Sequence, residues 1–437
     1  MKLSHFSING LFHIFNYEFT ISEDNQVFLI TGPNGYGKTT ILSILSSLHK
    51  RNLFYFYALP FDEINLEFEG SIAVYIKSIV QNNKETVDIA RQSDRTLEFT
   101  WSQSGTPVAH LNLTDKIYNA AKRKYNSAQD RIPFYESNSF PSFEDFYAKD
   151  YRNLESLFQG QEQALLFLMQ LQTLHITIQN SNRLSKKVDK EGNVVESIDQ
   201  VSNALKTIMG DAYLKYLKEV NKSNNGLYDK LLMANKAVTA EKYEKKSEKL
   251  ALKLKQLYDW GLTTEKKVRP FEEKHSDVLS VYIEELERNI QIYDRLYKQL
   301  QLFEKLLNEK MFSNKKIKFN PNHGISAIMD YDSYPLDLKK LSSGEQHEII
   351  MLFNAIFNTS TDSILLIDEP ENSLHVAWQN TFVSDITTIC QTLNAQVIIA
   401  THSPQIIGGR YKECYDLYAA QEEQQQFLHV AQEEKQQ

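Results

Sequence analysis

Residues 31–40, TGPNGYGKTT, constrain the fold more than any other stretch of this 437-residue chain. They match the pattern G-x-x-x-x-G-K-[ST], with the apolar run QVFLI directly before them and an amphipathic helical pattern directly after. Glycines in such a loop allow backbone N–H groups to converge on phosphate oxygens, Lys38 adds a positive charge, and the hydroxyl of Thr39 can bind Mg²⁺. The stretch therefore predicts a strand, a phosphate-binding loop and a helix within an α/β fold.

The phosphate loop is expected to hold the phosphates of ATP together with Mg²⁺. The residues that we expect to contact the nucleotide here are Asn34, Gly35, Gly37, Lys38, Thr39 and Thr40. Tyr36 is unusually bulky for this loop, and its ring is expected to point outward and pack on a neighbouring side chain.

Two later apolar runs end in polar side chains. ILLIDEP, residues 364–370, predicts a buried strand that ends in Asp368 and Glu369, and VIIATHSP, residues 397–404, predicts another that leads to His402. At the carboxyl edge of a parallel sheet, Asp368 can bind Mg²⁺ and Glu369 can polarise the water that attacks the γ-phosphate. His402 can then hydrogen-bond the γ-phosphate or that water. The alternative for the two acids is that they cap the next helix.

A second candidate anion site follows from LSSGEQ, residues 341–346. Ser343 and Gly344 can present a hydroxyl and backbone N–H groups at a helix N-terminus, and Glu345 completes the set of expected nucleotide contacts. Lys38 already serves the nucleotide of its own chain. The duplication therefore favours an enzyme that binds ATP between two subunits, with one loop from each.

The rest of the chain divides by periodicity. Between residues 62 and 101 the apolar residues alternate, which predicts an antiparallel meander with strands at INLEFEG, IAVYIKSI, TVDIAR and TLEFTW. Residues 141–311 are mostly helical in pattern, and a repeat with spacings of three and four predicts a coiled-coil seam or a long amphipathic helix on its own domain. The seam residues are Leu279, Tyr282, Leu286, Asn289, Tyr293, Leu296, Leu300, Phe303 and Leu307, and residues 240–260 are the candidate returning helix.

The motifs GPNGYGKT, LSSGEQ, LLIDEPENSLH and ATHSP together resemble the head of an ABC-type ATPase, most closely the branch shared by SMC proteins, double-strand-break-repair ATPases and OLD-family nucleases. The resemblance implies a Walker A motif at residues 32–40, a signature motif at 341–346, Walker B at 364–369, a D-loop at 371–375 and a switch histidine at His402. Gln81 is the candidate Q-loop glutamine, and the adenine-stacking aromatic is sought among residues 12–17.

The expected fold class is α/β, an ABC-type P-loop ATPase head with a mixed sheet and an antiparallel meander, interrupted by a long helical or coiled-coil insertion. The expected divisions are residues 1–140 and 312–420 for the head, 141–311 for the insertion, and 421–437 for a tail. A formal net charge of −8 is unfavourable to polyanions overall, and the lysine groups at 183–190, 241–255 and 314–318 are short or interleaved with acids. No apolar run has membrane-spanning length, and only two cysteines are present, so we expect a cytoplasmic protein.

The compact motif set is similar to the ATPase subunits of bacterial anti-phage systems such as PARIS or Septu. That similarity implies an ATPase, at least a dimer with ATP between its heads, that works with a separately encoded nuclease effector and responds to a phage protein or to DNA. An SMC-like DNA-repair ATPase is the main alternative, and a scaffold that uses ATP only to hold subunits together is another. A membrane-transporter ATPase is disfavoured by the helical insertion, and an OLD-type nuclease by the absence of an acidic cluster after His402.

Overall fold

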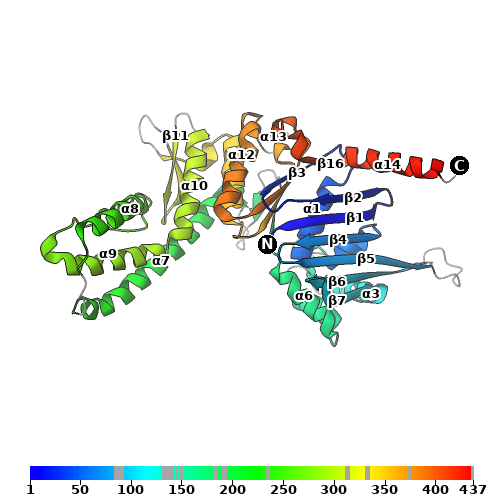
Figure 1. Cartoon of the computed structure of the whole chain (residues 1–437), viewed down its shortest axis with the longest axis horizontal. Helices are drawn as coiled ribbons and strands as arrows, with labels where there is room; N and C mark the ends of the chain where they lie inside the picture. Colours follow the sequence, from blue (N-terminus) through cyan, green and yellow to red (C-terminus); the bar gives the residue numbers. More distant parts are fainter. Residues whose placement is uncertain are drawn as a thin grey trace. The chain divides into compact units, whose positions relative to one another are not determined.

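The computed structural model describes residues 1–82, 93–129, 142–143, 146–147, 151–180, 186–188, 194–232, 237–310, 315–329, 335–372, 374 and 376–434. The chain forms two compact units, one of Met1–Ser181 with Asn358–Gln437 and the other of Asn182–Phe357. Each unit is described by itself below, with its elements labelled as in Figure 1.

The core of the first unit is a five-stranded sheet in the order β16-β3-β15-β14-β8, in which every neighbouring pair is parallel. Its strands are β3 Val27–Thr31, β8 Ile176–Asn180, β14 Ile364–Asp368, β15 Gln396–Ala400 and β16 Cys414–Asp416. The register pairs Asp368 with Ala400 and Ala400 with Ile30. The carboxyl ends of β3, β14 and β15 therefore meet at one edge, as the apolar runs predicted.

Strand β8 explains why the units divide where they do. It lies within the expected helical insertion, yet it pairs along its whole length with β14 of the core sheet. The first unit consequently extends to Ser181 rather than to residue 140, and the second extends to Phe357 rather than to residue 311. Residues 312–357, expected in the head, belong to the second unit because the helix that ends there packs on the helices of that unit.

The predicted meander is confirmed as part of a six-stranded antiparallel sheet, separate from the parallel one, in the order β2-β1-β4-β5-β6-β7 (Figure 1). Its strands are β1 Leu3–Leu11, β2 Phe15–Thr20, β4 Glu63–Phe68, β5 Ile72–Asn82, β6 Ser93–Gln103 and β7 Thr106–Thr114. The expected strand TVDIAR lies outside the described residues. The predicted α/β class is thus confirmed, with parallel and antiparallel strands in different sheets rather than one mixed sheet.

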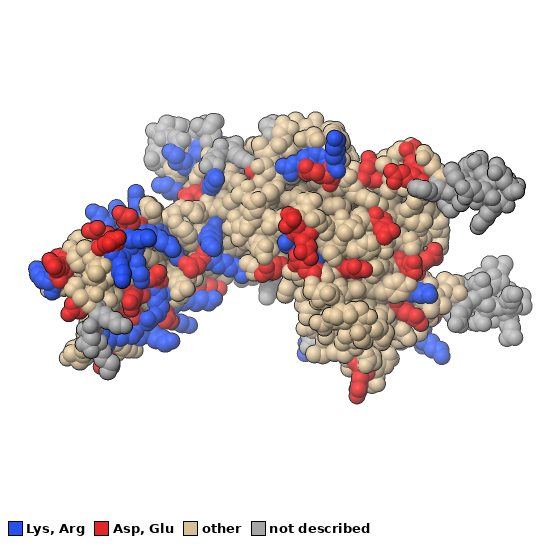
Figure 2. Space-filling model, viewed as in Figure 1, with Lys and Arg blue, Asp and Glu red and all other residues tan. Residues whose placement is uncertain are grey.

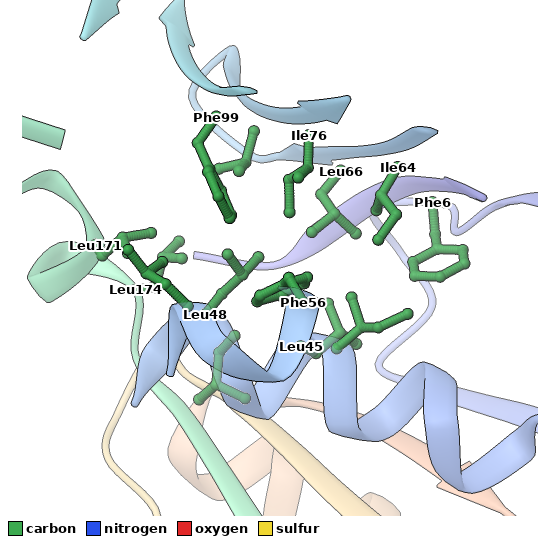
Figure 3. Packing of buried hydrophobic residues seen from close by; sticks show 14 of the residues in the cluster. Phe6, Leu45, Leu48, Phe56, Ile64, Leu66, Ile76, Phe99, Leu171 and Leu174 are labelled. Carbon is green, nitrogen blue, oxygen red and sulfur yellow. The ribbon is translucent and has the colours of Figure 1, made fainter. Parts of the chain in front are cut away.

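Helix α1, Lys38–His49, lies between the two sheets and begins at the phosphate loop. Its side chains Leu45 and Leu48 are fully buried and point toward the strands of the antiparallel sheet, where Ile64 and Ile76 meet them (Figure 3). Each such buried aliphatic side chain stabilises the unit by about 1.5–3 kcal/mol. The loop is therefore anchored by a helix that is held from both sides.

The remaining helices of the first unit surround these sheets. They are α2 Leu53–Ala58, α3 Asp115–Gln129, α5 Tyr151–Glu155, α6 Glu162–Gln170, α12 Val376–Leu393, α13 Pro404–Ile407 and α14 Leu417–Glu434, with 3₁₀ turns η3 Ser156–Phe158, η4 Leu171–Thr173, η7 Pro370–Asn372 and η8 Tyr411–Glu413.

The described part of the expected tail is helical. Helix α14 begins at Leu417, so the expected boundary at residue 421 falls inside it. The side chains of Gln421 and Gln424 donate to the backbone oxygens of Ile14, at 3.3 Å, and Asn16, at 2.8 Å. The first turns of α14 therefore pack against the β1–β2 hairpin.

The second unit is mainly helical, with two small antiparallel sheets. Its elements are β9 Lys186–Val188, β10 Val194–Glu196, α7 Ser197–Leu232, α8 Ala240–Asp259, η5 Glu273–His275, α9 Ser276–Gln291, α10 Asp294–Lys310, β11 Lys315–Asn320, β12 Gly324–Met329, β13 Pro335–Leu336, η6 Leu338–Lys340 and α11 Ser343–Phe357.

The expected seam is buried, but it lies on two helices instead of one. The α-helix is interrupted by a turn at residues 292–293, between α9 and α10, although Ile292 keeps helical backbone angles. Of the nine seam residues, only Tyr282 and Asn289 are half-buried, and the others are buried. Tyr293 sits at this break, fully buried, with its hydroxyl bonded to the backbone oxygen of Leu262 at 2.7 Å. The seam is the core face of a compact helical unit, so the continuous coiled-coil helix is not what forms.

The helix that returns along this seam is α7, not residues 240–260. Ser223 of α7 bonds to Glu285, and the ring of Tyr216, earlier in α7, packs at a tilt against the ring of the later Tyr293, so α7 runs antiparallel to α9. Helix α8 runs parallel to the seam instead, because Lys246 contacts Glu287 and the later Gln256 contacts the later Tyr297.

Candidate functional site

The phosphate loop, residues 32–37, has the backbone that its glycines predict. The φ angles of Gly32, Gly35 and Gly37 are 139°, 88° and 90°, which side chains rarely adopt. A Cβ on Gly32 would lie 3.2 Å from the Cβ of Leu417, and one on Gly37 would lie 3.2 Å from Leu11. Around Gly35, by contrast, nothing lies within 4 Å of such an atom. The loop is packed at its two ends and open in its middle.

The open middle of the loop fits a phosphate group. In the described part of the chain, the N–H groups of residues 34–37 donate to no protein acceptor. The Lys38 ammonium lies over the loop, bonded to the backbone oxygens of Gly32 at 2.7 Å and Pro33 at 3.0 Å. Burial lowers the pKa of Lys38, while the nearby carboxylates, Glu369 foremost, act in the opposite direction. Amide donors and a cation thus converge where an anion would bind.

Tyr36 packs as expected. Its ring centroid lies 5.4 Å from that of Phe15 and 5.7 Å from that of Tyr418, and its backbone oxygen accepts a hydrogen bond from Tyr17 at 2.8 Å. The bulky residue thereby fixes the loop against β2 and α14.

The two expected magnesium ligands are brought together across the sheet. The Thr39 hydroxyl donates to Asp368 Oδ1 at 3.3 Å, although the two residues are 329 positions apart in the chain. Burial raises the pKa of Asp368, and the hydrogen bond from Thr39 opposes that shift. A hydroxyl and a carboxylate beside a phosphate loop are the protein ligands that Mg²⁺ uses when phosphate oxygens supply the rest.

Glu369 follows Asp368 in a strained backbone conformation. Its φ angle is 45°, and its N–H donates to Ala400 of the neighbouring strand at 2.9 Å. Strained conformations of non-glycine residues cost of order 1–3 kcal/mol and cluster at functional sites. Asn372 donates to Glu369 Oε2 at 2.8 Å, which holds the carboxylate at the sheet edge and argues against a simple helix cap.

His402 reaches the same edge from β15. Its Nδ1 lies 3.9 Å from Glu369 Oε1 and 3.0 Å from Glu371 Oε1. Glu371 was expected only as the first residue of a D-loop, and no role in holding His402 was inferred from the sequence. The sequence feature that could have suggested this role is that Glu371, a third acid, directly follows the DEP residues 368–370. The D-loop positions Ser373 and His375 lie outside the described residues.

The second candidate loop, in the other unit, begins α11 with a reciprocal cap. Ser342 Oγ accepts from the Glu345 N–H at 3.3 Å, and Glu345 Oε2 accepts from the Ser342 N–H at 2.8 Å. Glu345 Oε1 also pairs with Lys315 at 2.9 Å. This is a capping box, so the carboxylate expected to contact nucleotide has a structural role. Ser343 is exposed and Gly344 half-exposed at the first positions of the helix.

Two further expectations have partial outcomes. Gln81 lies in β5, where its backbone pairs with Asp94, and its side chain is outside the described residues. In the turn between β1 and β2, Phe12 and Ile14 are 36% and 63% exposed, so apolar side chains do lie free near the phosphate loop. Which of them meets a base stays a prediction.

The surface of the helical unit carries mixed charge. Figure 2 shows Lys and Arg interspersed with Asp and Glu over α8 and α9. Lys246 pairs with Glu287 at 3.1 Å, and Lys253 pairs with Asp294. Two lysines of the group at 241–255 are thus paired with acids rather than grouped into a purely basic patch. Among the described residues, no helix is long and apolar enough to cross a membrane.

Comparison with known families decides the class of this site. A model described as an AAA ATPase domain matches residues 1–407. The chain belongs to the AAA ATPase domain family. The matched range contains the phosphate loop, the two carboxylates Asp368 and Glu369 at the end of β14, and His402. The family therefore supports nucleotide binding and ATPase activity. Strand β16 and helix α14 lie beyond residue 407, where the match to the AAA ATPase domain ends.

Individual relatives are more distant. Protein ea59 of Escherichia phage lambda is 30% identical over 84 residues, which are 19% of this chain and 16% of that protein, so the chain spans a minor part of its length. The Smc head domain of Pyrococcus furiosus, bound to the C-terminal domain of ScpA, aligns over 93% of this chain and 91% of its own at 11% identity and a TM-score of 0.37. The SMC head domain of Thermotoga maritima aligns over 95% and 92% at 12% identity and a TM-score of 0.33.

Proposed function

We propose that this chain is an ATP-hydrolysing, ABC-type ATPase subunit of an anti-phage defence complex, in which it acts as an oligomeric sensor or scaffold that controls a separately encoded nuclease. The observation that carries the ATPase part is the convergence of Lys38, Thr39, Asp368, Glu369 and His402 at one sheet edge. The defence part is supported by the resemblance of the motif set to the ATPase subunits of PARIS and Septu.

Each side chain has a role that its surroundings support. The loop amides and Lys38 bind the phosphates, and Thr39 with Asp368 would hold Mg²⁺, which supplies charge neutralisation at the β- and γ-phosphates. Glu369, held at the edge by Asn372, orients and polarises the attacking water. His402, next to it, bonds to the γ-phosphate or to that water. The strained backbone at Glu369 suits a group placed for chemistry rather than for stability.

Assembly follows from the second loop. The capping box fixes the start of α11. The N–H groups of Ser343 and Gly344, the first residues of that helix, therefore point along the helix axis at the positive end of the helix dipole. A facing chain would supply these groups to the γ-phosphate bound by Lys38. ATP then lies between two heads, and the protein is at least a dimer when loaded.

The first experiment measures ATP turnover and solution mass together. Steady turnover in the wild type that is lost in Glu369→Gln is expected, and the Glu369→Gln protein should gain mass on addition of Mg·ATP. Ser343→Arg should abolish that gain, whereas Ser384→Arg, at an exposed serine of α12, should not. Turnover that Glu369→Gln leaves unchanged, or a mass indifferent to ATP and to Ser343→Arg, would refute the ATP-gated dimer.

A second experiment tests the biological role. Cells that express the chain with its neighbouring genes should resist phage, and the Glu369→Gln variant should remove that resistance. Resistance that survives Glu369→Gln would refute control by hydrolysis. If instead the gene protects against DNA breaks and DNA stimulates turnover, with affinity that falls steeply with salt, the SMC-like repair ATPase is the correct reading.

A further inference from the structure

Glu371 stands out because the mechanism above assigns it nothing. It lies in the 3₁₀ turn η7 after β14, its side chain is only 7% exposed, and three nitrogen or oxygen atoms lie within 3.0 Å of one of its oxygens. Two are hydrogen-bond donors, the Thr401 hydroxyl and the His402 backbone N–H, each at 2.8 Å, and the third is His402 Nδ1, whose nitrogen lies 3.0 Å from the same oxygen. Both the backbone after β15 and the imidazole ring are therefore fixed by the same carboxylate.

We propose that Glu371 is the positioning residue for His402, and that it acts on ATP hydrolysis only through that imidazole. The inference rests on the ATPase function proposed above and adds a third carboxylate to its site. A histidine nitrogen placed 3.0 Å from a carboxylate oxygen is the one expected to carry the proton, so the inference puts the proton on Nδ1. Nε2, on the opposite side of the ring, is the atom left to meet the γ-phosphate or the attacking water.

The distances divide the work between two glutamates. Glu371 Oε1 is within hydrogen-bond reach of Nδ1, whereas Glu369 Oε1, at 3.9 Å, is beyond it. The other oxygen of Glu369 is occupied by Asn372. Glu369 is thus free of the imidazole and can act on water, while Glu371 holds the ring. Carboxylates that orient a functional histidine in this way fix its tautomer and its direction.

The second oxygen of Glu371 points to function rather than to packing alone. Within the described part of the chain, Glu371 Oε2 is buried and has no hydrogen-bond partner. A buried unsatisfied acceptor costs about 1–3 kcal/mol, and native folds keep few of them. A carboxylate needed only to join η7 to the loop after β15 would be replaced at less cost by a neutral amide. The retained charge is explained if it holds the imidazole ring in place.

The test is a double-mutant cycle on the full-length protein with Mg·ATP. Glu371→Gln keeps the shape and the Oε1 acceptor and removes the charge, so kcat should fall about 10- to 100-fold while the Kd for ATP stays within about twofold. In a His402→Ala background the same change should cost less than about twofold, because the residue it acts through is gone. Glu413→Gln, at an exposed glutamate of the same unit, is the control and should leave kcat unchanged.

Two outcomes would overturn the inference: an unchanged kcat in Glu371→Gln, or a full loss that persists in the His402→Ala background. If Glu371→Gln does not fold, Glu371→Asp takes its place in the cycle, because it withdraws the carboxylate from His402 by one methylene group and should lower kcat only when His402 is present. Nitrogen NMR of the wild type, with His402 assigned by His402→Ala, provides a readout that needs no turnover. A proton on Nδ1 is expected, and a proton only on Nε2 refutes the positioning role. If the wild type hydrolyses no ATP, the proposed ATPase function is refuted. The NMR measurement then still tests whether Glu371 positions His402.

Discussion

Glu345 is the residue for which sequence and structure give different roles, so its replacement is the most informative perturbation. The LSSGEQ motif suggests that Glu345 contacts nucleotide. In the structure, the Glu345 carboxylate instead accepts hydrogen bonds from the Ser342 N–H at 2.8 Å, the Ser342 hydroxyl at 2.9 Å and Lys315 at 2.9 Å. Its side chain is 13% exposed and that of Lys315 is 19% exposed. We predict that Glu345→Ala destabilises the second unit and leaves ATP affinity unchanged.

The size of the effect follows from those contacts. Loss of a helix cap costs about 1 kcal/mol, and loss of a half-buried charge-assisted hydrogen bond costs about 1.5 kcal/mol more. The sum, about 2–3 kcal/mol, corresponds to a decrease in Tm of about 5–10 °C for a unit of roughly 180 residues. The matched control is Glu284→Ala, at an exposed glutamate of α9, which should shift Tm by less than about 2 °C.

The pH dependence of the stability difference between wild type and Glu345→Ala provides an independent check. Burial alone would raise the pKa of Glu345, but the hydrogen bonds from Lys315 and Ser342 outweigh it and lower the pKa. A lowered folded-state pKa means that the contribution is present above the ordinary glutamate value of about 4.3 and is lost as the pH falls below it. The difference between wild type and Glu345→Ala should therefore be full at pH 7 and shrink below about pH 4.

Thermal unfolding followed by circular dichroism and ATP binding by calorimetry, on the same samples, decide between the two roles. An unchanged Tm with a loss of ATP-dependent assembly would show that Glu345 is a ligand and that the capping argument is wrong. A lowered Tm with normal assembly below the transition would show that the cap is its role.

Three further predictions concern stability and the loop. Gly32→Ala should weaken ATP binding at least tenfold and lower stability by about 1–3 kcal/mol, because φ is 139° and the new Cβ would meet Leu417 at 3.2 Å; binding within twofold of wild type would contradict it. Leu45→Ala, in the core between the sheets, should cost about 2–5 kcal/mol in denaturant unfolding, and a cost below 1 kcal/mol would show that the site collapses. Glu285→Ala, which removes a buried partner of Lys230 at 2.6 Å, should cost about 1–3 kcal/mol in the second unit, and an unaltered unfolding midpoint would show that the pair contributes nothing.

Local patterns were sufficient for elements that depend on neighbours in sequence. The strand before the loop, the loop itself and α1 follow from residues 26–49, because glycine conformation and apolar periodicity act over a few positions. Asp368 and Glu369 were placed at the carboxyl edge for the same reason, since a continuous apolar run ending in acids predicts a buried parallel strand. The buried face of α9 and α10 was likewise readable from its spacing.

Pairing between distant segments was decided only by the tertiary structure. Strand β8 looked like part of a helical region, and only its register with β14 makes it a core strand. The break before Tyr293 was invisible because the apolar spacing continues through it, and the buried hydroxyl bond to Leu262 is a long-range contact. The sequence by itself identified the residues that we propose for phosphate binding and hydrolysis. Two features depend on distances that no periodicity encodes. One is that Glu371 rather than Glu369 lies within 3.0 Å of His402 Nδ1, and the other is that Glu345 pairs with Ser342 and Lys315 at the start of α11.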